Sequence, residues 1–331
     1  MEAEPIARNV LAQLVDEADR AGIANIRAQL GGPFGSILYV ANVKSGALTM
    51  IGVPCGNRVL TTALPSAHAE DQAMGPAHLA ILRDVLKKQG REESLVIVAS
   101  SAESCAACHS KAEVLSRILA HEGLILPGRF MIAYGASVHD TKIVAGLNDE
   151  PYMNDIMAPP GKRLIKVSPG AVPANVKKLM GADRAVVAMP DGRLFAGADE
   201  RAKHFILIPE MVAIHAACLE QKKNRVPQPW KLDGAVMYSF TRDPGPLAYT
   251  ACQWANVQSW VVAEGGAETV EAPGIDNASL FRAVAQRPYN GAGTAVHIVH
   301  IQPFANLTQK EWRDTLARGG TSLENYNGIE A

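Results

Sequence analysis

Four residues in the first half of the sequence have the types and the spacing of a catalytic zinc site. His68 and Glu70 belong to a His-Ala-Glu triplet, and Cys105 and Cys108 form a Cys-x-x-Cys pair further along the chain. Two thiolates and one neutral imidazole bind Zn²⁺ with three protein ligands and leave the fourth tetrahedral position open for water. An open position is typical of catalysis, so the sequence predicts Zn²⁺ as a catalytic cofactor.

Glu70 has the position of a proton shuttle. It lies two residues after His68, where it need not bind the metal but can reach a metal-bound water. It would take a proton from that water, protonate a ring nitrogen of the substrate and pass a proton to departing ammonia. A His-x-Glu triplet is common, and a lone Cys-x-x-Cys could be a redox pair or a chance occurrence. Together, and in this order, they match the signature of zinc-dependent deaminases.

The predicted elements place the ligands at helix starts. Periodicity and turn residues predict, in chain order, a helix at 5–22, strands at 35–43 and 47–53, a helix from 68 onward, a strand at 94–99, a helix at 105–119, a strand at 130–134 and a helix at 139–147. Gly75-Pro76 should interrupt the helix that follows His68. The positive end of a helix dipole lowers the pKa of a thiol, which favours the metal-binding thiolate at Cys105.

The same alternation of strands and helices starts again in the second half, which predicts a layered α/β protein. Pro- and Gly-rich stretches at 159–161 and 168–170 indicate a linker, and therefore domains at 1–158 and 170–331. The second half is predicted to contain strands at 184–189, 194–197, 234–240 and 260–263, helices at 209–222 and 246–256, and a last helix that starts at 308.

Residues 20–150 resemble the cytidine-deaminase superfamily, most closely its branch of guanine deaminases and tRNA adenosine deaminases. The resemblance rests on Gly-Pro-Phe-Gly at 32–35, on Asn-Arg-Val-Leu at 57–60 and on the segment 65–70. It implies a three-layer α/β/α cytidine-deaminase-like sandwich with a central mixed sheet, present twice. It also implies that Asn57 hydrogen-bonds the substrate base, and it nominates Phe34 and Asp140 as further substrate-binding residues.

Each of these roles has a structural alternative, and the sequence departs from the family in two places. Asn57 could be a plain turn asparagine, and Asp140 an exposed aspartate at a helix start. The family usually has proline before its first cysteine and within the Cys-x-x-Cys interval, whereas this chain has Ser-Cys-Ala-Ala-Cys at 104–108. Residues 121–124 also look inserted. The zinc ligands are unaffected, but the pocket wall can differ from that of guanine deaminases.

The second half resembles the same family after loss of its metal ligands. Ile208 stands where the histidine would be, Glu210 keeps the glutamate, and Gly245 and Ala248 stand at the positions of the cysteines. Glu210 and Gly245 are 35 residues apart, as are the glutamate and the first cysteine of the first half. Because neither Gly nor Ala can bind zinc, we predict a degenerate, zinc-less deaminase-like domain. It would close the pocket of the first domain or, alternatively, be a stabilising remnant.

Composition and charge restrict the partners and the compartment. The chain has 331 residues and a formal net charge of -1, so no global positive field favours nucleic acid as a partner. No apolar run reaches the roughly 18–20 residues that span a bilayer, and the acidic start is unlike a secretory or transit peptide. We therefore expect a cytoplasmic protein without membrane contact. It would act on a small aminated heterocycle, either as a homodimer or as an intrachain pseudo-dimer of two repeats.

The remaining residues that could do chemistry are interpreted structurally. Cys55, Cys218 and Cys252 lack metal-like spacing and should be buried free thiols. His297 and His300 fall in an apolar strand and are interpreted as structural histidines. The four tryptophans could line a pocket, but packing is the preferred interpretation for each.

These features predict hydrolytic deamination of a free nucleobase or nucleoside-like heterocycle, with release of ammonia and a guanine-like purine as the favoured substrate. The alternative substrates are cytosine, a pterin or another aminated ring. Two further alternatives are a tRNA-editing deaminase, in which the second half binds tRNA, and a non-catalytic module in which zinc only holds the fold. An intact Glu70 counts against the last, because a structural zinc site has no use for a proton shuttle.

Overall fold

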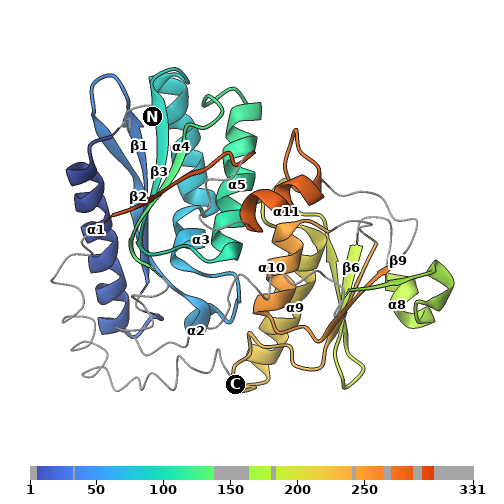
Figure 1. The fold of residues 1–331 in the computed structure, drawn as a ribbon. Coiled ribbons are helices and arrows are strands. Elements are labelled where there is room, and N and C mark those ends of the chain that lie inside the picture. Colours follow the sequence, from blue (N-terminus) through green and yellow to red (C-terminus); the bar gives the residue numbers. More distant parts are fainter. Residues whose placement is uncertain are drawn as a thin grey trace.

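The fold is built from two five-stranded mixed sheets with helices packed around them (Figure 1). The computed structural model describes residues 6–32, 34–137, 164–179, 184–240, 244–263, 270–285 and 293–301. Within these ranges, no helix is both long enough and apolar enough to cross a bilayer. The mixed α/β class expected from the sequence is confirmed.

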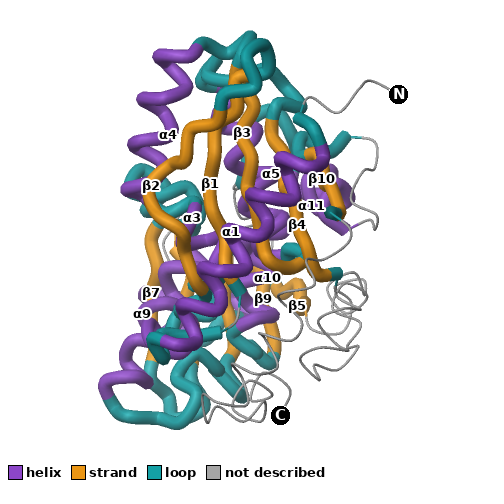
Figure 2. The backbone as a smooth tube through the Cα atoms, turned by 90° about the vertical axis from the view of Figure 1, so that its left-hand side faces the viewer, coloured by secondary structure: helices purple, strands orange, loops and turns teal. Residues whose placement is uncertain are grey.

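The first sheet has the strand order β10-β4-β3-β1-β2. Its strands are β1 (Gly35–Asn42), β2 (Leu48–Gly56), β3 (Ser94–Ala102), β4 (Phe130–Ala136) and β10 (His297–His300). Strand β1 pairs antiparallel with β2 and β3, whereas β4 is parallel to both β3 and β10. Figure 2 shows these strands side by side. All of β3 is buried, as expected for an apolar run covered on both faces.

Helices cover both faces of the first sheet. Helix α1 (Arg8–Arg27) lies on one face, and α3 (Ala69–Ala73), α4 (Pro76–Gln89) and α5 (Ala106–His121) lie on the other (Figure 1). The short helix α2 (Val59–Thr62) comes between β2 and α3 in the chain. The predicted break before Pro76 is confirmed, because proline starts α4 where no backbone donor is needed. Helix α1 continues beyond the predicted residue 22, since Ile23 and Ile26 extend its buried face.

The second sheet repeats this succession of pairings. Its order is β5-β9-β8-β6-β7, with β5 (Leu164–Val167), β6 (Arg184–Ala188), β7 (Leu194–Ala198), β8 (Val236–Ser239) and β9 (Ser259–Ala263). The β6–β7 and β6–β8 pairs are antiparallel, and the β8–β9 and β9–β5 pairs are parallel. Helices α9 (Pro209–Lys223) and α10 (Pro246–Trp254) lie between this sheet and the first half (Figure 1). Helix α8 (Ala174–Leu179) packs on the other face, and α11 (Asn277–Ala285) lies beside α10.

The first sheet takes one edge strand from the C-terminal part of the chain, whereas the second sheet is built from five consecutive strands. Strand β10 comes from the C-terminal part of the chain but pairs with β4, while β5 directly follows the first half but pairs with β9. Strand β10 therefore lies in the predicted second domain, and β5 lies in the predicted linker, where no strand was expected. The boundaries at 1–158 and 170–331 stay a prediction, and β10 crosses them to pair with a strand of the first half.

Helix α5 fastens the segment that leads into β10. The carboxylate of Glu113 accepts the backbone N–H groups of Ala295 and Val296 at 2.9–3.0 Å. At the far end of the strand, the imidazole of His300 stacks on Tyr134, with ring centroids 4.8 Å apart. These contacts make the C-terminal strand an integral part of the first sheet.

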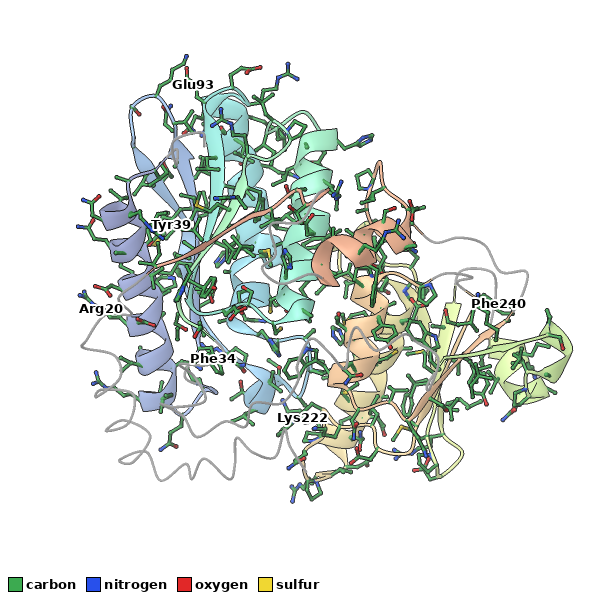
Figure 3. All side chains as sticks on the ribbon, viewed as in Figure 1. Arg20, Phe34, Tyr39, Glu93, Lys222 and Phe240 are labelled. Carbon is green, nitrogen blue, oxygen red and sulfur yellow. The ribbon has the colours of Figure 1, made fainter. Side chains whose placement is uncertain are left out.

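One hydrophobic core joins the two halves. It includes Val114 and Leu115 of α5, Ile214 of α9 and Leu247 of α10. Burying such side chains stabilises by roughly 25 cal/mol per Å² of apolar surface. At the edge of this interface, the ammonium group of Lys222 donates to the carbonyl oxygen of Thr61 at 2.5 Å (Figure 3). The two halves therefore pack as one body.

A buried carboxyl group lies on α1. Asp19 is 0% exposed, and neither of its carboxylate oxygens has a hydrogen-bond partner among the described residues. Burial, with a further contribution from Asp16, raises the pKa of Asp19 from 3.8 to about 8. The folded protein therefore holds this proton at pH values where the unfolded chain has lost it.

Asp19→Asn should flatten the pH dependence of stability. Because its pKa is raised on folding, the stabilisation from Asp19 is complete below pH 3.8 and is lost as the pH rises to about 8. Urea unfolding between about pH 5 and pH 9 should show wild type losing free energy of unfolding relative to the variant, with the difference levelling off above about pH 8. Asp84→Asn, at an exposed position on α4, is the matched control. If the free energy of unfolding depends on pH in the same way for wild type and Asp19→Asn, the raised pKa of Asp19 is wrong.

Candidate metal centre

The three predicted zinc ligands meet at the carboxyl end of β3. His68 is the residue before α3, Cys105 is the residue before α5, and Cys108 lies in the first turn of α5. The Nδ1 atom of His68 is 3.4 Å from the Sγ atoms of both Cys105 and Cys108. All three ligand atoms lie within 4.8 Å of one another. The structure thus brings together residues that are far apart in the sequence.

These distances fit a tetrahedral zinc ion. With Zn–S bonds of about 2.3 Å and a Zn–N bond of about 2.0 Å, tetrahedral angles place nitrogen and sulfur ligands about 3.5 Å apart. The observed separation of 3.4 Å needs only small adjustments to hold such an ion. Among the described residues these three are the ligands found, and a three-ligand group leaves the fourth position to water or substrate.

The two thiols differ in their tendency to ionise. Burial opposes ionisation of Cys105, but its hydrogen bonds with Cys108 and the adjacent His68 outweigh burial and hold its pKa well below the ordinary value. Burial, the hydrogen bond to Cys105 and the charge of Cys105 raise the pKa of Cys108 well above the ordinary value. A bound cation would supply the positive charge that allows both thiols to ionise.

Glu70 is held beside the ligands by two hydroxyl groups. It is 7% exposed, and its Oε1 atom accepts hydrogen bonds from Ser100 at 3.2 Å and Ser104 at 3.1 Å. Burial and the negative charge of Cys105 raise the pKa of Glu70 above its ordinary range. A raised pKa suits a carboxyl group that both accepts and donates protons near neutral pH.

A buried ion pair supports the segment that carries His68. Lys111 is 1% exposed, and its Nζ atom lies 2.9 Å from Asp71 and donates to the carbonyl oxygen of Ser66 at 2.9 Å. Burial opposes the charged form, but Asp71 and the nearby thiols outweigh it and raise the pKa of Lys111. Lys111 therefore stays charged and ties α5 to both sides of the His68 turn.

Comparisons with known proteins return limited similarity. No model of a protein family matches the chain, and no curated protein matches it. Among solved structures, the chain is similar to a guanine deaminase from Bacillus subtilis, with 22% identity, 44% of this chain and 73% of that chain covered, and a TM-score of 0.27. It is also similar to a structure from a study of A-to-I editing by tRNA:A34 deaminases, with 18% identity, coverages of 38% and 75%, and a TM-score of 0.24. The residues of the site, rather than these similarities, carry the functional proposal.

Asn57, the first residue nominated for substrate binding, directly follows β2. Asn57 is half-buried, and its Oδ1 atom accepts the N–H group of Val59 at 3.1 Å, which fixes the orientation of its amide. The next residue, Arg58, donates its N–H group to the carbonyl oxygen of Ala67, so this segment lies beside the one that leads to His68. Both the turn role and the base-binding role of Asn57 are compatible with this geometry.

Phe34 packs across the strand ends near the site. Its ring contacts Ala102 and Ala136, the last residues of β3 and β4, and Ile23 of α1 (Figure 3). It therefore lies at the same edge of the sheet as the metal ligands. Asp140 lies outside the described residues, so its role stays a prediction.

The corresponding positions of the second half contain no metal-binding side chain. Ile208 precedes α9 and Gly245 precedes α10, as the histidine and the first cysteine precede their helices in the first half. Glu210 is 2% exposed and accepts a hydrogen bond from the hydroxyl group of Ser239.

Glu271 occupies the space beside Gly245. Its carboxylate accepts the N–H groups of Leu247 and Ala248 at 2.8 and 2.9 Å. A Cβ atom on Gly245 would lie 2.3 Å from the carboxylate carbon of Glu271, so no cysteine fits there without displacing it. No local pattern pointed to Glu271, because its partners lie more than 20 residues away in the chain.

A cavity of about 870 Å³ opens between the halves away from the metal centre. It is lined by residues of both halves, including Arg83, Glu122, Asp199 and Arg201. Both arginines are already in ion pairs, Arg83 with Glu122 and Arg201 with Asp199. None of the predicted site residues that the structure describes lines this cavity.

Proposed function

We propose that this protein is a zinc-dependent hydrolase that removes the amino group of a small aminated heterocycle and releases ammonia. One observation carries the proposal: the three possible ligands His68, Cys105 and Cys108 lie beside the buried carboxyl group of Glu70. This carboxyl group accepts hydrogen bonds from two serine hydroxyl groups and is not needed as a ligand. A structural zinc site would instead be closed by a fourth protein ligand.

The metal ligands and Glu70 have separate roles in this reaction. His68, Cys105 and Cys108 would hold the ion, which when bound lowers the pKa of a coordinated water so that it becomes a nucleophile near neutral pH. Glu70 would accept a proton from the attacking water and deliver it to a ring nitrogen of the substrate. It then transfers the second proton of the water to the leaving amine, so that water and an aminated ring give an oxo ring and ammonia. Ser100 and Ser104 fix Oε1, and we assign these transfers to Oε2.

The substrate we favour is a guanine-like purine, as a free base or a nucleoside. Asn57, Phe34 and Asp140 are the proposed binding residues, and the contacts of the segment after β2 with the segment before His68 support a role for Asn57. Cytosine, a pterin or another aminated ring is the alternative, because the zinc chemistry is common to all of them and only the pocket selects.

We further propose that the second half is a degenerate copy of the catalytic half. The two sheets have the same succession of antiparallel and parallel pairs, which supports this. In the second half the hydroxyl group of Ser239 donates a hydrogen bond to Glu210, just as the hydroxyl group of Ser100 donates one to Glu70 in the first half. The second half would then act as an intrachain partner of the active half.

Ammonia release from a panel of substrates tests the function. Zinc-loaded protein is incubated with guanine, adenine, cytosine, their nucleosides and aminated pterins, beside protein stripped by a chelator. We expect release from one ring class, lost on stripping and restored by zinc. Protein that holds one zinc ion per chain but releases no ammonia from any ring would count against deamination.

A further inference from the structure

Two side chains of the second half contact the segment that carries the histidine ligand. The indole of Trp254, the last residue of α10, lies with its ring centroid 4.5 Å from that of His68, with the ring planes at 87°. The Nε2 atom of His215, on α9, lies 2.8 Å from the hydroxyl oxygen of Ser66, two residues before His68. The metal ligand is therefore held from outside its own half.

The local backbone of His68 does little to orient its ring. The residue stands before α3, a helix of only 5 residues, and its side chain makes no capping hydrogen bond. The ring must nevertheless present Nδ1 toward both sulfur atoms. An edge-to-face neighbour restricts rotation of an aromatic ring about its side-chain bonds. Trp254 is the neighbour placed to do this.

His215 steadies the backbone on the other side of the same turn. Burial lowers its pKa to about 4, so the ring is neutral around pH 7 and its hydrogen bond with Ser66 does not change there. Ser66 is also the residue whose carbonyl oxygen accepts from Lys111. The turn before His68 is thus fixed by α5 of the first half and by α9 of the second.

We propose that Trp254 and His215 are positioning residues for His68, so that the second half, which binds no metal at the corresponding site, sets the zinc affinity of the first half. The proposal rests on the zinc site of the proposed function but not on the reaction. Groups that orient a metal-binding histidine typically change metal affinity by about 10- to 100-fold.

Helix α10 contacts Glu271 of the second half at its first turn and His68 of the first half at its last residue. At about 1.5 Å per residue, its 9 residues span roughly 14 Å.

The test compares zinc affinity in full-length variants. Trp254→Leu removes the aromatic contact but keeps apolar bulk, Trp254→Phe keeps a smaller aromatic ring, and Trp230→Leu is the matched control at another half-buried tryptophan of the second half. Competition with a chromophoric chelator gives the zinc dissociation constant, and the absorption bands of bound Co²⁺ report ligand geometry. We expect about tenfold weaker zinc binding and altered Co²⁺ bands for Trp254→Leu. Trp254→Phe and Trp230→Leu should remain close to wild type.

His215→Ala provides a second, independent test of the same proposal. It should weaken zinc binding in the same direction as Trp254→Leu, and it decides the matter if Trp254→Leu fails to fold. Wild-type zinc affinity and Co²⁺ bands in the folded Trp254 and His215 variants would overturn the proposal, even if their melting temperatures fall. Wild-type protein that binds zinc but releases no ammonia would instead overturn the proposed function and leave this proposal intact.

Discussion

Replacing Glu70 with glutamine should reduce ammonia release by about 10²–10⁴-fold while leaving the zinc content unchanged. The amide can still accept the hydrogen bonds of Ser100 and Ser104 through Oε1, so the site keeps its shape. It cannot carry a proton from water to the ring or to the leaving amine. Initial rates of ammonia release, measured together with zinc per chain, separate the loss of proton transfer from the loss of metal.

The second half offers a matched control for this substitution. Glu210 is buried and accepts a hydroxyl hydrogen bond from Ser239, much as Glu70 does from Ser100. Glu210→Gln should therefore fold normally and retain the wild-type rate. If zinc-loaded Glu70→Gln keeps that rate as well, the assignment of Glu70 as the proton shuttle is wrong.

Cys108→Ser should lose more zinc affinity than the roughly 100-fold expected when only an orienting group is removed. A serine hydroxyl has nearly the same shape but does not ionise near neutral pH, so the ion loses one of its two thiolate ligands. In wild type, zinc binds the folded state and should raise the melting temperature as its concentration exceeds the dissociation constant. The variant should show little of this rise at the same zinc concentration.

Thermal unfolding with added zinc and with chelator measures this effect directly. Cys55→Ser is the control, because Cys55 is a half-buried thiol with a hydrogen bond to the carbonyl oxygen of Val53 and no role at the metal. It should respond to zinc as wild type does. An equal zinc response in Cys108→Ser would show that the stabilising ion binds elsewhere.

The local pattern of the sequence was sufficient to predict most elements and the ligand group. The apolar run of β3 and the break before Pro76 are visible in neighbouring residues, and the structure confirms both. The group of His68, Cys105 and Cys108 was predicted from the residue types and spacing of the His-x-Glu and Cys-x-x-Cys motifs, and the structure brings the three residues together. Such signals need no knowledge of distant segments.

Contacts between distant segments could not be predicted. Strand β5 lies between Pro- and Gly-rich stretches and was interpreted as linker, because its partner β9 follows almost 100 residues later. Trp254 was interpreted as a packing residue, and its contact with His68 joins positions far apart in the chain. Glu271 fills a space that only the folded second half creates. In each case one partner carries no local sign of the other.

The pairing of the C-terminal strand β10 with the first sheet has a consequence for synthesis of the chain. When Ala136 leaves the ribosome, β4 has β3 on one side and an open edge on the other, and that edge is covered only after His297–His300 have been made. At about 5–20 residues per second, the delay is on the order of ten seconds or more. An open parallel edge is a template for pairing with other nascent chains. A nascent first half should therefore depend on chaperones until its final strand arrives, and a gene split between the halves should give soluble protein only when both pieces are made together.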